Sequence, residues 1–437
     1  MQEDIINYFL SRKRKYGQQY GLEHISFLLS YFGNIHQLLR VIHISGTNGK
    51  GSVVSFLSSI ISKSGFKVGS FSSPFYRTIS DMYKINCREL RLPKFYKYFC
   101  DVRQAVEVIE KSNDIYFTEF EIEVALAFFI FHREKCGVVV METGCGGLLD
   151  ATNIITKPLI SVLTSIDYDH VELLGHTLEE IAYHKCGIIK QGCDAITLST
   201  NDTIVLGKIQ EECAKKHAQI HIANIKEITR VKYSSHSQYF IYGKQKYAMK
   251  MLGKYQIDNA FLAVKVCEIL TNRGILDISK KNIKMGLLSA HNEGRFEIIH
   301  HGITFILDGA HNVGAAIKLK QSLKTFYRSR KYIFVFGMFR DKQAEEFIKI
   351  LLGDAFKIFL TPLPDKSRSF ATAELFNIVF NFNKRVYECA DVDEAIRRAR
   401  DSAIRGAIVI VCGSISFLHL AHKAIKSIKS LCGDAAH

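Results

Sequence analysis

A glycine-rich segment has the clearest capacity for chemistry in this sequence. It separates a β-branched run from a helix-like run and consists of Gly46, Thr47, Asn48, Gly49, Lys50, Gly51 and Ser52. Glycine lets backbone N–H groups turn inward around phosphate oxygens, and the N-terminus of the next helix adds a favourable dipole. Lys50 can reach terminal phosphates, while the Ser52 hydroxyl suits magnesium. The segment therefore predicts a phosphate-binding loop.

This loop departs from the strict GxxxxGK[ST] pattern, because Gly51 stands where serine or threonine is expected. The alternative is an ordinary glycine turn that carries an incidental lysine. The strand-like and helix-like flanks favour the phosphate-binding interpretation.

Three further polar side chains follow predicted strands, at the edge where α/β proteins bind ligands. They are Ser73 after residues 67–72, Glu142 at the end of 137–142, and His170 after 159–166. Magnesium prefers oxygen ligands, so Glu142 and Ser73 suit it better than His170 does. Each residue also has an ordinary explanation: a turn serine, a solvated carboxylate and a structural histidine.

One lysine lies on the apolar side of a predicted helix. Leu178, Ile181, Lys185 and Ile188 follow one another at helical spacing. Burial of a charged lysine is unfavourable and would lower its pKa. The ordinary explanation is an ammonium group that reaches outward along its aliphatic stem. The sharper alternative is a chemically modified lysine.

The elements that must position these residues alternate between strand-like and helix-like runs, which indicates parallel sheets covered by helices. We predict strands over residues 41–45, 67–72, 137–142, 159–166 and 194–198, and helices over 52–63, 119–132, 177–189 and 256–271. The fold class is therefore α/β, with an N-terminal P-loop-type, mostly parallel sheet that carries helices on both faces.

A short polar stretch near Gly294 marks a change in the pattern. A hairpin is predicted over residues 296–307, followed by strands over 332–337, 356–360 and 407–412. We place a domain boundary there, which gives domains 1–294 and 295–437. The second is predicted to be a smaller Rossmann-like α/β domain.

Composition narrows the class of protein. The chain has 437 residues, enough for two domains, and its eleven cysteines form no CxxC pair, which favours free thiols in a reducing compartment. The polar N-terminus does not resemble a signal peptide, and no apolar run is long enough for a membrane span. We expect a cytoplasmic protein without membrane association. The net charge of +15 is spread along the chain rather than clustered, so we do not expect nucleic-acid binding.

The phosphate loop begins a resemblance that continues in order along nearly the whole chain. GTNGKGS is similar to the loop of folylpolyglutamate synthases and dihydrofolate synthases, which are members of the Mur ligase superfamily. The further matching pieces are SSP, TEFE, ETGCGGLLDATN, TSIDYDHVELLG, IAYHKCGIIK, YQIDNA, GRFE, DGAHN and CGSISF. No piece except the loop is diagnostic alone, whereas their common order is.

The resemblance implies a set of nucleotide and metal contacts. Magnesium would be held by Ser52, Ser73, Glu142 and His170, and Lys185 would be carboxylated so that its carbamate ligates a second magnesium ion. Asn259 would contact adenine, Arg295 the phosphates of ATP and Asp308 its ribose. Lys50, Lys185 and His170 would act in catalysis.

The same resemblance implies substrate contacts. Leu22, Glu23, Thr118, Glu121, Leu148 and Asp150 would contact the folate substrate, and His311 and Ser414 the incoming glutamate. For Thr118 and Glu121 a helix capping box is an equal alternative. His311 and Ser414 are equally explained as local hydrogen-bonding residues.

Four positions depart from the pattern of the family. His184 and Cys186 flank the lysine where Glu and Ala are common, Leu148 replaces an arginine, and Phe75 replaces a histidine. The departures leave the preference among folate substrates open.

The resemblance implies an ATP-dependent amide ligase that forms an acyl phosphate and joins L-glutamate to dihydropteroate, to reduced folates, or to both. We expect a monomer. Alternatives are a folylpolyglutamate synthase alone, a cell-wall amide ligase, an inactive binding relative, and a P-loop ATPase that acts on nucleic acid and exploits the positive charge.

Overall fold

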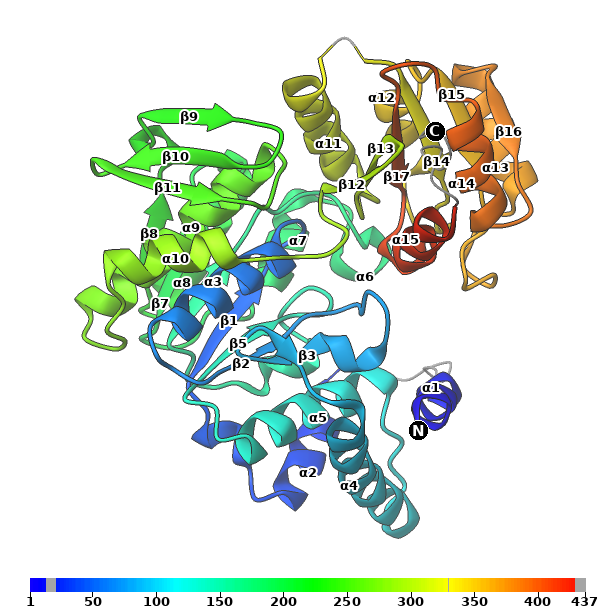
Figure 1. Ribbon diagram of the computed structural model, residues 1–437. Helices are drawn as coiled ribbons and strands as arrows, with labels where there is room; N and C mark the ends of the chain where they lie inside the picture. Colours follow the sequence, from blue (N-terminus) through cyan, green and yellow to red (C-terminus); the bar gives the residue numbers. More distant parts are fainter. Residues whose placement is uncertain (13–20, 329, 429–437) are drawn as a thin grey trace, which may run out of the picture.

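The computed structural model describes residues 1–12, 21–328 and 330–428. Figure 1 shows two lobes: a larger N-terminal lobe, coloured blue to green, and a smaller C-terminal lobe, coloured yellow to red. Within the described residues the chain forms three sheets, two of which belong to the larger lobe.

The main sheet of the larger lobe has eight strands in the described chain, in the order β4-β3-β2-β5-β1-β6-β7-β8. Their bounds are β1 (Val41–Ser45), β2 (Val68–Phe71), β3 (Tyr83–Ile85), β4 (Arg88–Glu89), β5 (Val138–Glu142), β6 (Ile160–Leu163), β7 (Asp194–Leu198) and β8 (Gln219–Ala223). Strands β3 and β4 are antiparallel to their neighbours, and the others are parallel. The central strands are apolar on both sides, as expected for a sheet covered on both faces.

Helices cover both faces of this sheet. One face carries α3 (Lys50–Lys63), α9 (Tyr255–Asn272), α10 (Lys280–Ser289) and a small antiparallel sheet of β9 (Arg230–Tyr233), β10 (Gln238–Tyr242) and β11 (Gln245–Met249). The other face carries α1 (Gln2–Ser11), α2 (Glu23–Tyr31), α4 (Leu92–Ser112), α5 (Glu119–Arg133), α6 (Val171–Leu174), α7 (Leu178–Cys186) and α8 (Thr203–Lys215). Alternate residues of β1 show the division, because Ile42 faces α3 whereas Val41 packs toward α5.

The C-terminal lobe is built around a mixed sheet of six strands in the described chain, in the order β12-β13-β17-β14-β15-β16. The strands are β12 (Glu297–His301), β13 (Ile303–Leu307), β14 (Tyr332–Phe336), β15 (Lys357–Leu360), β16 (Val386–Glu388) and β17 (Ile408–Cys412). Helices α11 (Val313–Phe326), α12 (Ala344–Leu351) and α13 (Thr372–Phe382) cover one face, and α14 (Val392–Asp401) and α15 (Leu418–Ser427) the other.

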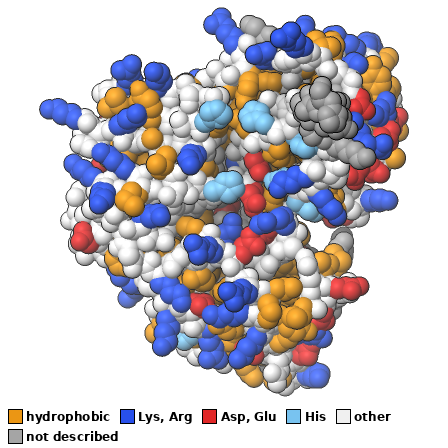
Figure 2. Space-filling model, viewed as in Figure 1, with side chains coloured by type: hydrophobic (Ala, Val, Ile, Leu, Met, Phe, Trp, Pro, Cys, Tyr) orange, Lys and Arg blue, Asp and Glu red, His pale blue; other side chains and the backbone are white. Residues whose placement is uncertain are grey.

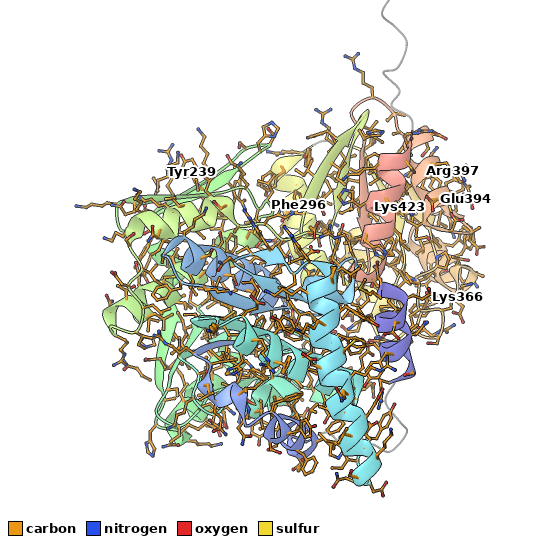
Figure 3. The ribbon with its side chains drawn as sticks, turned by 60° about the horizontal axis from the view of Figure 1, so that its bottom comes forward. Tyr239, Phe296, Lys366, Glu394, Arg397 and Lys423 are labelled. Atoms are coloured by element: carbon orange, nitrogen blue, oxygen red, sulfur yellow. The ribbon has the colours of Figure 1, made fainter. Side chains whose placement is uncertain are left out.

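The two lobes meet at the segment that precedes β12. Phe296 is buried there, and its ring lies 5.4 Å from that of Phe326 on α11. Figure 3 shows Phe296 at the junction of the lobes, whereas Arg397 and Lys423 lie on helices of the smaller lobe. The boundary at residue 294 stays a prediction, although the strands of the third sheet begin soon after it.

The predicted fold class is confirmed, with differences at the ends of elements. Helix α3 begins at Lys50, two residues earlier than predicted, and β6 ends at Leu163 rather than continuing to 166. Helix α7 ends at Cys186, three residues before the predicted end. The small sheet formed by residues 230–249 was not predicted, because its first strand is largely exposed and lacks a clear apolar alternation.

The described residues contain no helix long and apolar enough to cross a membrane. Every cysteine in this part of the chain is a free thiol, in agreement with the prediction from spacing. Residues 13–15 and 429, part of the basic runs noted in the sequence, lie outside the described residues.

Candidate active site

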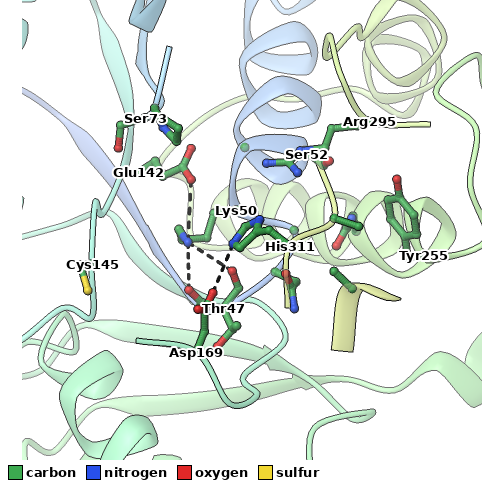
Figure 4. A pocket seen from close by; sticks show the side chains of 18 of the residues that line it. Thr47, Lys50, Ser52, Ser73, Glu142, Cys145, Asp169, Tyr255, Arg295 and His311 are labelled. Atoms are coloured by element: carbon green, nitrogen blue, oxygen red, sulfur yellow. Dashed lines mark hydrogen bonds and ion pairs between the residues drawn. The ribbon is translucent and has the colours of Figure 1, made fainter. Parts of the chain in front are cut away.

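The phosphate loop borders a cavity of about 140 Å³ between the two lobes. The cavity lies at the carboxyl ends of β1 and β5, and Figure 4 shows residues of both lobes pointing into it. The predicted residues that line it are Gly46, Thr47, Asn48, Gly49, Lys50, Gly51, Ser52, Ser73, Glu142, His170, Lys185, Asn259, Arg295, Asp308 and His311. The fold thus brings together every predicted nucleotide and metal residue.

Two glycines give the loop its path. Gly46 has φ of 145°, and a Cβ there would lie 1.9 Å from the Thr164 hydroxyl. Gly49 has φ of 94° and caps α3, so that Lys50 is the first residue of the helix. Side chains are disfavoured at both positions, by backbone strain and by space. The loop therefore presents the start of α3 to the cavity, as phosphate binding requires.

Lys50 and Glu142 face each other inside the cavity. Lys50 Nζ donates to the main-chain oxygen of Gly46 at 3.0 Å and lies 4.0 Å from Glu142 Oε1. Glu142 is 4% exposed, and its Oε2 atom has no hydrogen-bond partner in the described chain. Burial raises the pKa of Glu142 to about 7, although Lys50 and Arg295 oppose that effect. A buried oxygen without a partner, beside a lysine, indicates that the site is completed by a cationic ligand.

The oxygen atoms that line the cavity suit a magnesium ion that is coordinated partly by the protein and partly by a nucleotide. Glu142, Ser73 and Ser52 offer oxygen atoms to the same cavity, and the described residues contain no cluster of three or more His, Cys, Asp or Glu that would form an all-protein cage. Magnesium commonly uses one or two protein oxygens together with phosphates and water. Burial lowers the pKa of His170 to about 4, so its imidazole is neutral near pH 7, as a metal ligand must be.

Lys185 is buried, and its amine points toward the phosphate loop. The residue is 3% exposed, and Nζ donates to the main-chain oxygen of Gly46 at 3.0 Å. The interpretation of an outward-reaching ammonium is therefore wrong, because α7 packs its apolar side, with Lys185 on it, against the loop. Burial, and next the charge of Lys50, lowers the pKa of Lys185 to about 8. The neutral form of this amine is therefore more accessible near pH 7 than that of an exposed lysine.

Three residues of α9 in the larger lobe make hydrogen bonds at or beside the predicted adenine and ribose contacts. Asn259 on α9 is buried and donates to Gln256 Oε1 at 3.1 Å, and Gln256 in turn donates to Ser52 Oγ. Tyr255 donates its hydroxyl to Asp308 Oδ2 at 2.7 Å and so connects the lobes. Neither Tyr255 nor Gln256 was predicted as a site residue, although both belong to the YQIDNA piece.

Asp308 is buried where the smaller lobe closes on the loop. Its carboxylate accepts hydrogen bonds from the backbone N–H groups of Phe296 and Ala310, both at 2.9 Å, besides the Tyr255 hydroxyl. Arg295 lines the same cavity and makes no hydrogen bond or ion pair within the described residues, so the predicted alternative of a hinge salt bridge is not found. Its guanidinium remains available for an anionic ligand.

A buried network that the sequence analysis missed joins the lobes on the other side of the loop. Asp169 Oδ1 accepts from Lys342 Nζ at 2.7 Å, and its Oδ2 accepts from Asn312 at 3.0 Å and lies 3.3 Å from His311 Nε2. Asn312 also exchanges hydrogen bonds with Asn48. Burial alone would raise the pKa of Asp169, but His311 and Lys342 hold it well below its usual range. The position of this aspartate, next to His170 in the quoted TSIDYDHVELLG piece, was the available signal.

A second, larger cavity of about 490 Å³ adjoins the first. The predicted substrate residues among its lining are Thr118, Glu121 and Asp150, and the departures Phe75 and His184 also line it. The two cavities share the lining residues Ser73, Pro74, Gly144 and Cys145. Its walls are mostly apolar, with Phe120 and Met82 among them, as expected for a site that takes a flat organic ligand.

Three predicted substrate residues cap helices. Thr118 and Glu121 form the capping box of α5, with Glu121 Oε2 accepting from Thr118 N at 2.8 Å. Asp150 caps residues 151–154 by accepting from Thr152 N and also accepts from Cys145 N at 2.9 Å. All three also line the larger cavity, so capping does not remove them from it.

Four predicted substrate residues do not line either cavity in the described chain. Leu148 packs its backbone against Gly187 at the end of α7, and its neighbour Leu149 faces the larger cavity instead. Leu22 packs into the core beneath α2 and Glu23 is exposed at the start of that helix, so only the preceding Gly21 lines the cavity. Ser414 accepts from Ser416 N at 3.2 Å, which is the local role weighed as its alternative.

Both lobes match models of a single class of enzyme. The Mur ligase middle domain matches residues 44–267, and the Mur ligase glutamate ligase domain matches residues 294–415. The dihydrofolate synthase/folylpolyglutamate synthase of Bacillus subtilis is 31% identical over 422 residues, which cover 94% of this chain and 96% of that protein. The chain thus has the middle and glutamate ligase domains of a Mur ligase.

Solved structures agree with this class. The folylpolyglutamate synthase of Thermotoga maritima has a TM-score of 0.81 and 30% identity, covering 97% of this chain and 96% of that one. Escherichia coli FolC in complex with DHPP and ADP has a TM-score of 0.84 and 25% identity, covering 97% of each chain. The chain belongs to the folylpolyglutamate synthase and dihydrofolate synthase family of Mur ligases, and it is an ATP-dependent glutamate ligase of that type.

Proposed function

We propose that this chain adds L-glutamate both to dihydropteroate and to the γ-carboxylate of reduced folates. The observation that carries the proposal is the wall of Ser73, Pro74, Gly144 and Cys145 shared by the two cavities. A substrate whose pteridine ring lies in the larger, apolar cavity would direct its carboxylate toward the phosphates at the loop. Two relatives support both activities, since the Bacillus subtilis protein carries both names and Escherichia coli FolC was solved with DHPP and ADP.

The proposed reaction has two steps. A carboxylate oxygen of the substrate attacks the γ-phosphorus of ATP, the bond to the bridging oxygen of ADP breaks, and an acyl phosphate forms. The amine of glutamate then attacks the acyl carbon, phosphate leaves from the tetrahedral intermediate, and the amine proton passes to solvent. Activation is necessary because a free carboxylate accepts an amine poorly, and no protein nucleophile is required.

In this proposal Lys50 and Arg295 bind the transferred phosphoryl group from opposite lobes. Lys50 Nζ donates to the main-chain oxygen of Gly46, both side chains line the cavity, and Arg295 has no competing partner in the described chain. Two fixed cations at the site of developing charge stabilise the transition state in a site from which water is excluded. Because Arg295 precedes the smaller lobe, this contact would couple ATP binding to lobe closure.

Magnesium would be held by Glu142 and Ser73, with Ser52 on its nucleotide side and neutral His170 nearby. The ion supplies charge neutralisation for the phosphoryl oxygens when it is bound. We further propose that the neutral amine of Lys185 captures CO2: its Nζ forms a bond to carbon, and a proton is released to solvent. The carbamate would then hold a second magnesium ion, and burial of the amine supports this, since capture requires the unprotonated form.

Asn259, Asp308 and Tyr255 would hold the nucleoside, and His311, on the rim of the cavity in the smaller lobe, would approach the incoming glutamate. Thr118, Glu121 and Asp150 would contribute to the folate cavity beside their capping roles. The domain limits, the monomeric state and the cytoplasmic location predicted from the sequence stay predictions.

The experiment that tests the proposal is phosphate release with ATP, magnesium and glutamate, with dihydropteroate or tetrahydrofolate in parallel reactions. Turnover of both substrates is expected. Turnover of tetrahydrofolate alone would refute the bifunctional proposal and would direct attention to Phe75 and His184 in the larger cavity. Lys50→Ala is the matched control, since loss of the phosphate-binding cation should abolish both reactions.

A nucleic-acid-dependent ATPase predicts a different result. Figure 2 shows Lys and Arg side chains scattered over the visible face of the molecule rather than gathered in one band, which favours a small anionic substrate. ATP hydrolysis that needs nucleic acid and ignores glutamate would favour this alternative over the ligase.

A further inference from the structure

The larger cavity contains a buried carboxyl group that the preceding proposal does not use. Glu123 on α5 is 6% exposed and lines this cavity. Its carboxyl oxygens have no hydrogen-bond or ion-pair partner among the described residues. The Tyr83 hydroxyl donates to the main-chain oxygen of Glu123 at 3.2 Å, so this contact does not pair the carboxyl group, and the residue lines the cavity.

Helix α5 gains nothing in folding from this glutamate. Residues 122–131 of the helix are otherwise apolar and buried, so Glu123 is the single ionisable side chain in that run. Burial, with the nearby charge of Glu119, raises the pKa of Glu123 well above its usual range. An unpaired buried carboxyl group lowers stability, whereas leucine would suit the core. A ligand that completes its hydrogen bonds is the physical reason to keep it.

Three other carboxyl side chains line the cavity, those of Glu119, Glu121 and Asp150, and each already has a partner. Glu121 accepts from the backbone and hydroxyl of Thr118, and Asp150 accepts from Thr152 and Cys145. Glu123 lies one turn beyond Phe120 on the cavity side of α5, since residues three and four apart share a helix face. The cavity thus joins an aromatic wall to a carboxyl group whose hydrogen bonds are unmade.

This combination selects a flat heterocycle with two adjacent N–H donors on one edge. Two such donors favour the ionised form of the carboxyl group, and the carboxylate then accepts the pair in parallel, as it does from a guanidinium group. We propose that Glu123 determines specificity for the pteridine, because its carboxyl group accepts hydrogen bonds from the 2-amino group and the neighbouring ring N–H of the 2-amino-4-oxo ring. The inference rests on the proposed function, for it identifies how the folate cavity recognises its substrate.

The test compares Glu123→Leu and Glu123→Gln with the wild-type enzyme and with Ile122→Leu, a control on the same helix that does not line the cavity. Binding of dihydropteroate is measured by fluorescence titration, in parallel with an analogue that lacks the 2-amino group. Wild-type enzyme should bind the analogue at least roughly tenfold more weakly, whereas Glu123→Leu should bind both ligands equally weakly. The KM values for ATP and glutamate should stay unchanged in each variant.

Thermal unfolding separates this role from a structural one. Without ligand, Glu123→Leu should unfold at a higher temperature than the wild type, because the unpaired carboxyl group is gone. A lower unfolding temperature, or undiminished preference for the 2-amino ligand in either Glu123 variant, would overturn the inference. Glu123→Gln keeps the shape of the side chain and provides the same readout if leucine fails to fold. Absence of pteridine binding by the wild type would overturn the proposed function itself.

Discussion

The ion pair between Lys342 and Asp169 offers a direct test of how the two lobes are held together. Lys342 follows β14 in the smaller lobe, and Asp169 follows β6 in the larger one. Their atoms Nζ and Oδ1 lie 2.7 Å apart, and each side chain is 6% exposed. Lys342→Met removes the cation but keeps most of the side-chain length, so the buried carboxylate is left with His311 and Asn312.

The magnitude follows from burial. Removing one partner of a buried ion pair destabilises the structure that holds the pair by about 3–5 kcal/mol. Because two hydrogen-bonding partners stay with Asp169, we take the lower limit, ~3 kcal/mol, which corresponds to roughly a 150-fold change in an equilibrium constant. Each lobe has its own core, so this change acts on lobe closure rather than on unfolding. The variant should populate an open arrangement.

Small-angle X-ray scattering of the ligand-free protein measures this opening as an increased radius of gyration. Steady-state kinetics should show a higher KM for ATP, because closure brings Arg295 and Asp308 to the cavity that we propose as the nucleotide site. Lys320→Met is the matched control: Lys320 pairs with the exposed Asp354 within the smaller lobe, and such a surface pair contributes little.

A double-mutant cycle with Asp169→Asn decides between coupling and independent effects. In the Asp169→Asn background, Lys342→Met should reduce the free energy of lobe closure far less than in the wild type. The buried carboxylate that the substitution would leave without its cation is already absent there. Wild-type scattering and KM in Lys342→Met, or simple additivity in the double variant, would refute the reasoning.

Three further predictions concern the cavity and the core beneath it. Glu142→Gln should abolish turnover yet raise the ligand-free unfolding free energy at pH 8. The unfolding free energy of the wild type falls by ~3 kcal/mol as pH rises from ~4 to about 7, because Glu142 keeps its proton until about pH 7 in the folded protein but ionises near pH 4 in the unfolded chain. A stability gain of Glu142→Gln in denaturant titrations that does not grow with pH would contradict this. Lys185 should give a carbamate carbon signal in NMR spectra with ¹³C-bicarbonate, stronger above pH about 8, and Lys185→Arg should lack both signal and activity. Gly286→Ala should lower the unfolding free energy by about 1–3 kcal/mol with an unchanged kcat, because its Cβ would lie 2.4 Å from the Ile60 Cα; a kcat that falls with stability would contradict a purely structural role.

The phosphate loop and the strands that hold it were predictable from local sequence. Residues 41–45 are all buried and include the β-branched Val41, Ile42 and Ile44, the glycine-rich loop follows immediately, and a helix begins at Lys50. The apolar stripe around Lys185 likewise predicted its burial, although not the direction of the amine. These features depend on periodicity and on the conformational freedom of glycine, which act over a few neighbouring residues.

The roles of individual substrate residues were less predictable. Leu148 and Ser414 belong to segments near the site, but the path of the backbone turns Leu149 toward the larger cavity and Ser414 toward Ser416. One residue of offset decides which side chain of a loop faces a ligand. Glu123 was not predicted as a cavity residue, because a glutamate in an apolar helix gives no local sign that a cavity lies beside it.

The sequence by itself determined the order of the elements, the glycine-rich loop between β1 and α3, and the position of Lys185 on the apolar side of its helix. Only the tertiary structure decided which groups meet across the lobes. Asp169 and Lys342 are separated by 173 positions, and Asn48 and Asn312 by 264. Local periodicity fixes which face of an element is buried, whereas the packing of two lobes fixes which buried charges become partners. The closed cavity at the phosphate loop, our proposed nucleotide site, is therefore a property of lobe packing, which no local pattern encodes.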